Sequence, residues 1–323
     1  MRVLITGAGG FIGRNLTGEL LREGRLNDRT GQSQSIEQIV LLDNDLVEAS
    51  DSRLTLLRAD ITSPETLRQI AAQKFDTIFH LAAVLTSVAE REPTRALSIN
   101  ITALSNLIEA VGSKQAPPRI IFPSSLAVFG GLLPDTVDDD YMRRPQTTYG
   151  THKAIAELLL ADATRQGVID ARTLRLPIVL VHPGPPTDSV SDRIAAVIRE
   201  STAGRDVVCP LRHDTRVPVV SVQTVVRNLV NLHNLEMTKL RGKRAFNQPA
   251  LTVTMDDIAT AVGRVRNGKP SGKITFEPDP ELKQIVDGWP KGFISTRAKS
   301  MGTTSDRTID DIVASYLKGL ATT

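Results

Sequence analysis

Two side chains with acid–base chemistry, Tyr149 and Lys153, stand four residues apart at the start of a strongly helical stretch, 154–163. Residues four apart share one face of a helix, so we expect the phenol and the ammonium to lie side by side. A phenol is a poor base at neutral pH, because its reference pKa is about 10, but a neighbouring ammonium stabilises the phenolate and lowers that pKa. The spacing therefore predicts a pair that takes a proton from an alcohol while hydride leaves its carbon. The alternative is a Tyr/Lys pair on the surface of a helix without any function, because the same four-residue spacing is common there.

Two hydroxyl side chains, Ser124 and Ser125, close the apolar segment 119–123, which is predicted to be a strand. In open α/β sheets, ligands bind at the carboxyl ends of the strands. The position of the two serines therefore predicts that they face a ligand.

The first thirteen residues combine a strand, a glycine-rich turn and the start of a helix. Residues 2–6 are aliphatic and β-branched, Gly7, Gly10 and Gly13 follow at a three-residue spacing, and 14–23 is amphipathic. Backbone N–H groups and the helix dipole at such a turn favour a pyrophosphate, and glycine allows its close approach. The arrangement predicts a dinucleotide site; the alternative is a tight glycine turn without a ligand.

A carboxylate, Asp43, ends the second predicted strand, 39–43. In a dinucleotide fold, a carboxylate at this place binds the adenosine ribose hydroxyls and repels a 2′-phosphate, which predicts NAD rather than NADP. The usual distance from the glycines is about 20 residues. Here it is longer, and we assign the excess to a predicted surface loop at 24–35. Asp45 is a weaker candidate, and Asp43 could instead be a strand-end turn residue.

Weaker candidates for the cofactor site follow the next predicted strands. Asp60, after strand 54–58, could receive the adenine amino group, and small residues after strand 77–80 let a cofactor lie close. Thr86 could face the nicotinamide pocket. Asn100, an amide on an apolar face of the predicted helix 96–111, needs a buried partner. A sixth strand is predicted at 171–176.

These motifs resemble the extended short-chain dehydrogenase/reductase family in spacing and order. They are Gly7-x-x-Gly10-x-x-Gly13, Leu81-Ala82-Ala83, Ser125 five residues before Gly130, and Tyr149-x-x-x-Lys153. The resemblance implies an α/β fold, a Rossmann-type doubly wound parallel sheet with a smaller mixed C-terminal substrate lobe. We expect the NAD-binding domain at 1–182, with 217–235 returning to it, and mainly the substrate lobe at 183–323.

The resemblance also implies the roles of individual residues. Ser125 orients the substrate oxygen, Tyr149 is the general base or acid, and Lys153 binds the nicotinamide ribose and tunes Tyr149. Further residues implied at the cofactor are Phe11 and Ile12 over the pyrophosphate, Asp60 and Ile61 beside adenine, Asn100 on the cofactor side, and Pro177-Ile178-Val179 along the nicotinamide. A homodimer formed through the helix after Tyr149 and its neighbour is a further expectation.

Several longer stretches resemble one subgroup of that family, the D-erythronate dehydrogenases, which use NAD to oxidise the 2-hydroxyl of a four-carbon sugar acid. They are 124–130, 149–160, 174–177, 209–210, 214–217 and 285–290. A substrate carboxylate needs a cation, and Arg216 is a candidate because its planar fork matches a carboxylate bidentately. Arg175 could serve instead, and Arg216 could be an ordinary surface residue.

Composition excludes several other classes of function. The net charge is only +3, the basic residues are dispersed, and aromatic residues make up 4% of the chain, so we expect no nucleic-acid partner. The single cysteine, Cys209, excludes a disulfide framework. We find no cluster of metal ligands, no apolar run of membrane-spanning length and no leader before the first strand. A cytoplasmic protein is the expectation.

The predicted function is NAD-dependent oxidation of the 2-hydroxyl of a short, D-erythronate-like sugar acid to the 2-keto acid. A rival is a nucleotide-sugar epimerase that retains NAD. The 4,6-dehydratases of the same family carry an acidic pair where this chain has Leu126 and Ala127, which disfavours dehydration. A non-catalytic NAD-binding regulator is a third possibility, which the intact Tyr149/Lys153 pair disfavours.

Overall fold

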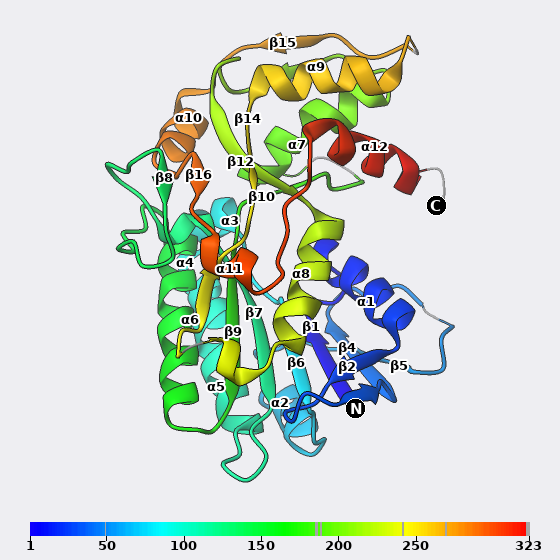
Figure 1. The fold of residues 1–323 in the computed structure, drawn as a ribbon, viewed down its shortest axis with the longest axis vertical. Coiled ribbons are helices and arrows are strands. Elements are labelled where there is room, and N and C mark those ends of the chain that lie inside the picture. The colour runs from blue at the N-terminus through cyan, green and yellow to red at the C-terminus, as the bar shows by residue number, and fades with distance from the viewer. Residues whose placement is uncertain (49, 185–186, 188, 241, 269, 321–323) are drawn as a thin grey trace.

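A computed structural model describes residues 1–48, 50–184, 187, 189–240, 242–268 and 270–320. Its centre is a seven-stranded sheet with the order β13-β9-β7-β6-β1-β4-β5, in which every neighbouring pair is parallel (Figure 1). The strands of this sheet that come next in the sequence, β4 and β5, lie on one side of β1, and β6, β7 and β9 lie on its other side. The strand order reverses at β1, so the switch point of the sheet lies where β1 meets the glycine-rich turn. The strands are β1 Arg2–Thr6, β4 Gln38–Asp43, β5 Leu54–Arg58, β6 Thr77–His80, β7 Arg119–Ser125, β9 Asp170–Leu176 and β13 Ala245–Asn247.

Helices cover both faces of this sheet, because its strands are apolar on both sides. In β1, Val3 and Ile5 belong to the core beneath α1 (Phe11–Glu23) and α8 (Val222–Asn234). Leu4 points the other way, into the core formed with three further helices. Those helices are α2 Pro64–Ala71, α5 Ala103–Val111 and α6 Thr148–Arg165. The doubly wound α/β fold predicted from the sequence is confirmed.

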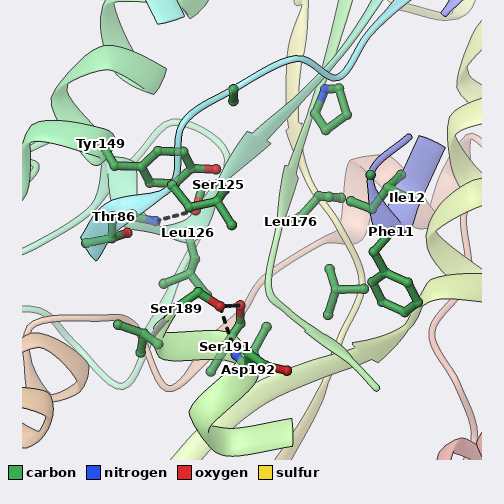
Figure 2. A pocket seen from close by; sticks show the side chains of 18 of the residues that line it. Phe11, Ile12, Thr86, Ser125, Leu126, Tyr149, Leu176, Ser189, Ser191 and Asp192 are labelled. Atoms are coloured by element: carbon green, nitrogen blue, oxygen red, sulfur yellow. Dashed lines mark hydrogen bonds between the residues drawn. The ribbon is translucent and has the colours of Figure 1, made fainter. Parts of the chain in front are cut away.

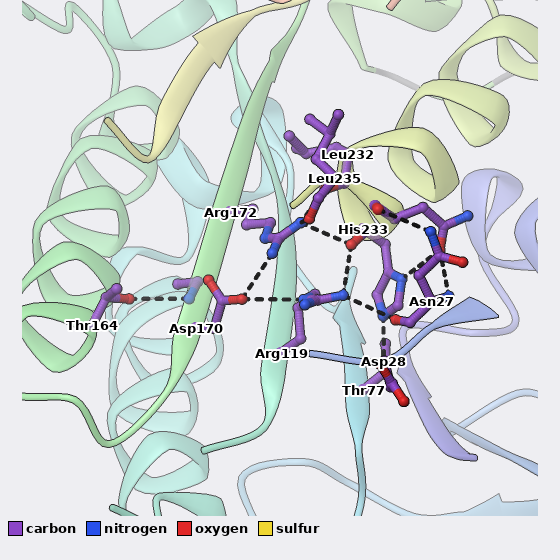
Figure 3. A network of polar contacts seen from close by, with 12 residues as sticks. Asn27, Asp28, Thr77, Arg119, Thr164, Asp170, Arg172, Leu232, His233 and Leu235 are labelled. Atoms are coloured by element: carbon purple, nitrogen blue, oxygen red, sulfur yellow. Dashed lines mark hydrogen bonds and ion pairs between the residues drawn. The ribbon is translucent and has the colours of Figure 1, made fainter. Parts of the chain in front are cut away.

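A buried polar network anchors α8 to the sheet (Figure 3). Nη1 of Arg172 donates to the carbonyl oxygens of Leu232, His233 and Leu235 at 2.7, 2.8 and 2.7 Å, and Nη1 of Arg119 donates to that of His233 at 2.7 Å. The last carbonyls of a helix have no intrahelical donors, so these guanidinium groups satisfy them. The network joins a helix late in the sequence to strands β7 and β9.

A second lobe lies beyond the carboxyl ends of the strands, in the upper half of Figure 1. A three-stranded sheet, β10-β12-β14, packs there against α7, α9 and α12. These elements are β10 Ile178–Leu180, β12 Arg216–Ser221, β14 Leu251–Thr254, α7 Val190–Thr202, α9 Met255–Arg266 and α12 Ile309–Leu320. Smaller elements are β8 Thr136–Val137, β11 Val207–Cys209, β15 Ile274–Phe276, β16 Gly292–Phe293, α3 Thr86–Arg91, α10 Pro280–Asp287, α11 Thr296–Ser300, and the short helices η2 Leu126–Val128 and η3 Met237–Leu240.

Two local predictions were wrong. The predicted loop at 24–35 contains a hairpin of β2 (Arg25–Asn27) and β3 (Ser33–Ser35), which looked like a loop because an exposed ribbon is polar. The helix predicted at 96–111 starts earlier, with α4 (Pro93–Leu97), and passes through a π-helix, η1 (Ser98–Thr102), before α5. Within the described chain, no helix has both the length and the apolar character that crossing a membrane requires.

Candidate active site

A cavity of about 380 Å³ lies between the carboxyl end of the main sheet and the second lobe (Figure 2). Most of the predicted site residues line it, although they come from elements far apart in the sequence. They are Gly7, Gly10, Phe11, Ile12, Gly13, Leu81, Ala83, Thr86, Ser125, Tyr149, Lys153, Pro177 and Val179. Parallel strands bring these segments together, because their carboxyl ends share one edge of the sheet.

Tyr149 and Ser125 lie side by side at this cavity, although Tyr149 belongs to α6 and Ser125 is the last residue of β7 (Figure 2). Tyr149 is in the first turn of α6, whose N-cap Thr147 accepts a hydrogen bond from Gly150 N at 3.1 Å. A Cβ on Gly150 would lie 2.1 Å from the carbonyl oxygen of Ala127, so glycine allows α6 to begin close to the segment after Ser125. Burial raises the pKa of Tyr149, while a hydrogen bond with Ser125 acts to lower it.

Lys153 lies deeper, with 5% of its surface exposed. Its Nζ donates to the carbonyl oxygen of Pro123 at 2.8 Å and lies 5.7 Å from the centroid of the Tyr149 ring. Burial lowers the pKa of Lys153 to about 7. The sequence predicted that this ammonium lowers the pKa of Tyr149; in the protein alone that is wrong, because desolvation of the phenol dominates.

The glycine-rich turn has the shape that a dinucleotide requires. Gly7 adopts a φ of +70°, and a Cβ there would lie 2.6 Å from Ala82 N. A Cβ on Gly13 would lie 2.4 Å from the carbonyl oxygen of Gly7, so the turn and α1 pack backbone to backbone. The first turn of α1 contains no acidic residue. Its N–H groups, which lack intrahelical acceptors, therefore form a cradle that fits a diphosphate.

Three residues predicted at the adenosine end do not line the cavity. Asp43 is the last residue of β4, and Asp60 and Ile61 follow β5, on the far side of β4 from β1. Asp43 accepts hydrogen bonds from Gly9 N at 3.0 Å and Asp45 N at 3.3 Å, which supports the glycine-rich turn. Asp60 accepts from the N–H and hydroxyl of Thr62, both at 2.8 Å. Ile61 is buried.

Asn100 finds its buried partner in the loop after β6. Its Oδ1 accepts from Val84 N at 2.8 Å, and its Nδ2 donates to the carbonyl oxygen of Val84 at 3.0 Å. The same Nδ2 lies 3.4 Å from Nδ1 of His152, the residue before Lys153. Asn100 therefore does not line the cavity but fixes the loop that does. Ala82 likewise packs against Gly7 rather than lining the cavity.

Neither candidate arginine lines the cavity. Arg216 is exposed and pairs with Asp135 at 2.7 Å. Arg175 is buried and pairs with Glu157 at 2.8 Å. The lining instead includes polar residues at the start of α7 that the sequence reasoning missed, although Ser189 followed three residues later by Asp192 is a helix-start pattern. The missed polar lining residues at the start of α7 are Thr187, Ser189, Ser191 and Asp192, and the lining also includes His182 and Trp289 from other segments.

Comparison with known proteins gives consistent matches, which for two relatives cover nearly the whole chain. The model of a family described as NAD dependent epimerase/dehydratase matches residues 3–242. D-erythronate dehydrogenase of Cupriavidus necator is 36% identical, over 99% of this chain and 100% of the relative, and that of Haemophilus influenzae is 32% identical, over 98% and 99%. The crystal structure of a nucleoside-diphosphate-sugar epimerase from Agrobacterium tumefaciens has a TM-score of 0.90 at 30% identity and covers 98% of this chain and 94% of its own.

Proposed function

The chain belongs to the NAD-dependent epimerase/dehydratase family, and from this premise we propose that it oxidises the 2-hydroxyl of a short, D-erythronate-like sugar acid to the 2-keto acid. The family and the two dehydrogenase relatives make the protein an NAD-dependent oxidoreductase. NAD supplies the hydride acceptor. Its diphosphate would be held by the N–H groups in the first turn of α1, those of Phe11 and Ile12, and its nicotinamide ribose by Lys153.

The convergence of Ser125, Tyr149 and Lys153 on one cavity beside the glycine-rich turn carries this proposal. The substrate hydroxyl binds between Ser125 and Tyr149, and the phenolic oxygen receives its proton. The raised pKa of Tyr149 makes the resting group a neutral phenol. Oxidation therefore requires the phenol to lose its proton first, and we expect the oxidation rate to rise with pH.

The same premise supports a second candidate, a nucleotide-sugar epimerase that retains NAD. The observation in its favour is the similarity to the solved nucleoside-diphosphate-sugar epimerase. The two D-erythronate dehydrogenase relatives, which align over nearly their full lengths, favour the sugar acid. A non-catalytic NAD-binding role is disfavoured by the shared cavity of Tyr149 and Lys153.

A screen for NADH formation with C4 to C6 aldonates, with and without nucleotide sugars, tests the proposal. We expect NADH from a four-carbon acid; conversion of a nucleotide sugar without net NADH would instead identify the epimerase. Tyr149→Phe should lower turnover by about a hundredfold to ten-thousandfold while NADH binding persists. Tyr316→Phe, a phenol outside the cavity lining, is the matched control. Full turnover by Tyr149→Phe would contradict the proposed role.

We also propose that the protein is a homodimer formed through α6 and the neighbouring α4. Leu97 on α4 and Ile155 and Leu158 on α6 are 47%, 37% and 56% exposed, and the two helices pack together. Exposed large apolar side chains on packed neighbouring helices are typical of an interface. A light-scattering mass equal to that of the monomer would contradict the dimer.

A further inference from the structure

His182 stands in the cavity without a role in the chemistry described so far. It follows β10 and the nicotinamide-side segment, and its ring lies 5.0 Å from that of Phe11, edge to face at 72°. Phe11 is the first residue of α1, and its side chain lies at the side of the cavity opposite Tyr149 (Figure 2). The imidazole therefore lies beside the helix N-terminus that forms the diphosphate cradle.

One ring nitrogen of His182, Nδ1, is left without a partner among the described residues, although the backbone of this residue is held in place. Nδ1 is shielded from solvent and has no hydrogen-bond partner within the described part of the chain. The carbonyl oxygen of the same residue accepts from Nη1 of Arg199 at 3.1 Å, and Arg199 forms a buried pair with Asp192 at 2.5 Å. A shielded polar atom without a partner is costly, and such atoms are rare. A rotation of the ring that turns this nitrogen toward the cavity would let a ligand there satisfy it.

Arg14 is the cation near His182 that would favour an anion as that ligand, because Arg199 is neutralised by its pairs with Asp192 and Glu200. Arg14 approaches from α1, and Arg199 and Asp192 from α7. Burial, Arg14 and Arg199 lower the pKa of His182, while Asp192 raises it, so the free protein holds a neutral imidazole at neutral pH. A diphosphate beside the ring would raise that pKa again, because an opposite charge stabilises the imidazolium.

We propose that His182 is a ligand of the cofactor's diphosphate, which it binds from the side of the second lobe, opposite the glycine-rich turn. This goes beyond the proposed substrate, since it requires only that the enzyme binds NAD. Because the bound complex holds the imidazole proton more tightly than the free protein, binding takes up a proton. Cofactor affinity is then highest at low pH and falls as the pH rises through the titration range of His182.

The test is a fluorescence titration of NADH on the folded protein at about pH 6 and about pH 8.5, on either side of the usual histidine range. We expect His182→Phe to weaken NADH binding about tenfold at the lower pH, the worth of one charge-assisted hydrogen bond, and to reduce the pH dependence to the part that comes from Lys153. His182→Gln, which can donate but not ionise, should recover part of the affinity and none of the pH dependence. His213→Gln, an exposed histidine outside the cavity lining, should behave like the wild type.

Competition with cofactor fragments localises the effect. ADP-ribose contains the diphosphate and adenosine does not, so His182→Phe should weaken the first and leave the second unchanged. The assignment would be overturned if His182→Phe weakened the binding of ADP-ribose and adenosine equally, or if this variant bound ADP-ribose as tightly as the wild type does. The titration needs no substrate, so a negative screen with aldonates would count against the proposed function and leave this result standing. Far-UV circular dichroism of each variant checks that it is folded.

Discussion

The guanidinium of Arg175 forms a two-bond fork on the carboxylate of Glu157: Nε donates to Oε1 at 2.9 Å and Nη2 to Oε2 at 2.8 Å. Glu157 also accepts from the hydroxyl of Ser124 at 2.6 Å and from Arg143 at 2.9 Å. Glu157 is four residues after Lys153 on α6. The cluster therefore ties the helix that carries Tyr149 and Lys153 to strands β7 and β9.

A variant that breaks this cluster should have a lower free energy of unfolding than the wild type. Arg175→Met leaves Glu157 buried with a weakened set of partners, and we expect the free energy of unfolding to fall by about 3–5 kcal/mol. Urea unfolding followed by circular dichroism measures the change. Arg216→Met, which removes an exposed pair with Asp135, should cost at most about 1 kcal/mol. Similar losses in the two variants would contradict this account of the buried fork.

Arg216 also separates two interpretations of substrate binding. It was predicted to grip the substrate carboxylate, yet its side chain is exposed and paired with Asp135 outside the cavity lining. We therefore expect Arg216→Met to leave the KM for the sugar acid close to that of the wild type. Steady-state kinetics across substrate concentrations test this. A large rise in KM at unchanged kcat would return Arg216 to the substrate site.

Two glycines on the same helix should respond in opposite ways to alanine. In Gly13→Ala the new methyl group meets the backbone of Gly7 and Ala8, at 2.4 and 2.7 Å, so we expect a loss of about 1–3 kcal/mol of stability and weaker NADH binding. Gly18→Ala meets nothing within 4 Å and should raise stability by about 0.5–1 kcal/mol, because alanine loses less conformational entropy in a helix. Thermal unfolding and NADH titration measure both effects. Normal cofactor binding by Gly13→Ala would count against the tight turn.

Lys153 should make stability depend on pH in a defined direction. Its pKa is lowered to about 7 from 10.5, so above pH 7 the unfolded chain binds the proton more readily than the folded protein does. The free energy of unfolding should then rise with pH between these values, by at most about 1.4 kcal/mol per pH unit. Urea midpoints at several pH values, compared with those of Lys153→Met, isolate this contribution. Equal slopes for the two proteins would show that Lys153 is not titrating there.

Much of the fold and of the chemistry was determined by local sequence. Residues 2–6 followed by glycines at fixed spacing specify a strand, a turn and a helix wherever the segment is placed, because only glycine tolerates the positive φ at Gly7 and the close contact at Gly13. The four-residue spacing of Tyr149 and Lys153 likewise puts them on one helix face. Such features depend on neighbours along the chain, so the sequence alone was enough to identify them.

Tertiary structure decided the rest, because it depends on residues that are distant in the sequence. The pKa values of Tyr149 and Lys153 follow from how deeply packing buries them, which no spacing reveals. Arg175 could equally have gripped a substrate until α6 brought Glu157 against it. His182 had no local signal at all, and acquires its place only when β10 brings it beside Phe11 of α1. The sequence determines the chemistry of each side chain, whereas the packing of the sheet against the second lobe determines its partners and its exposure to water.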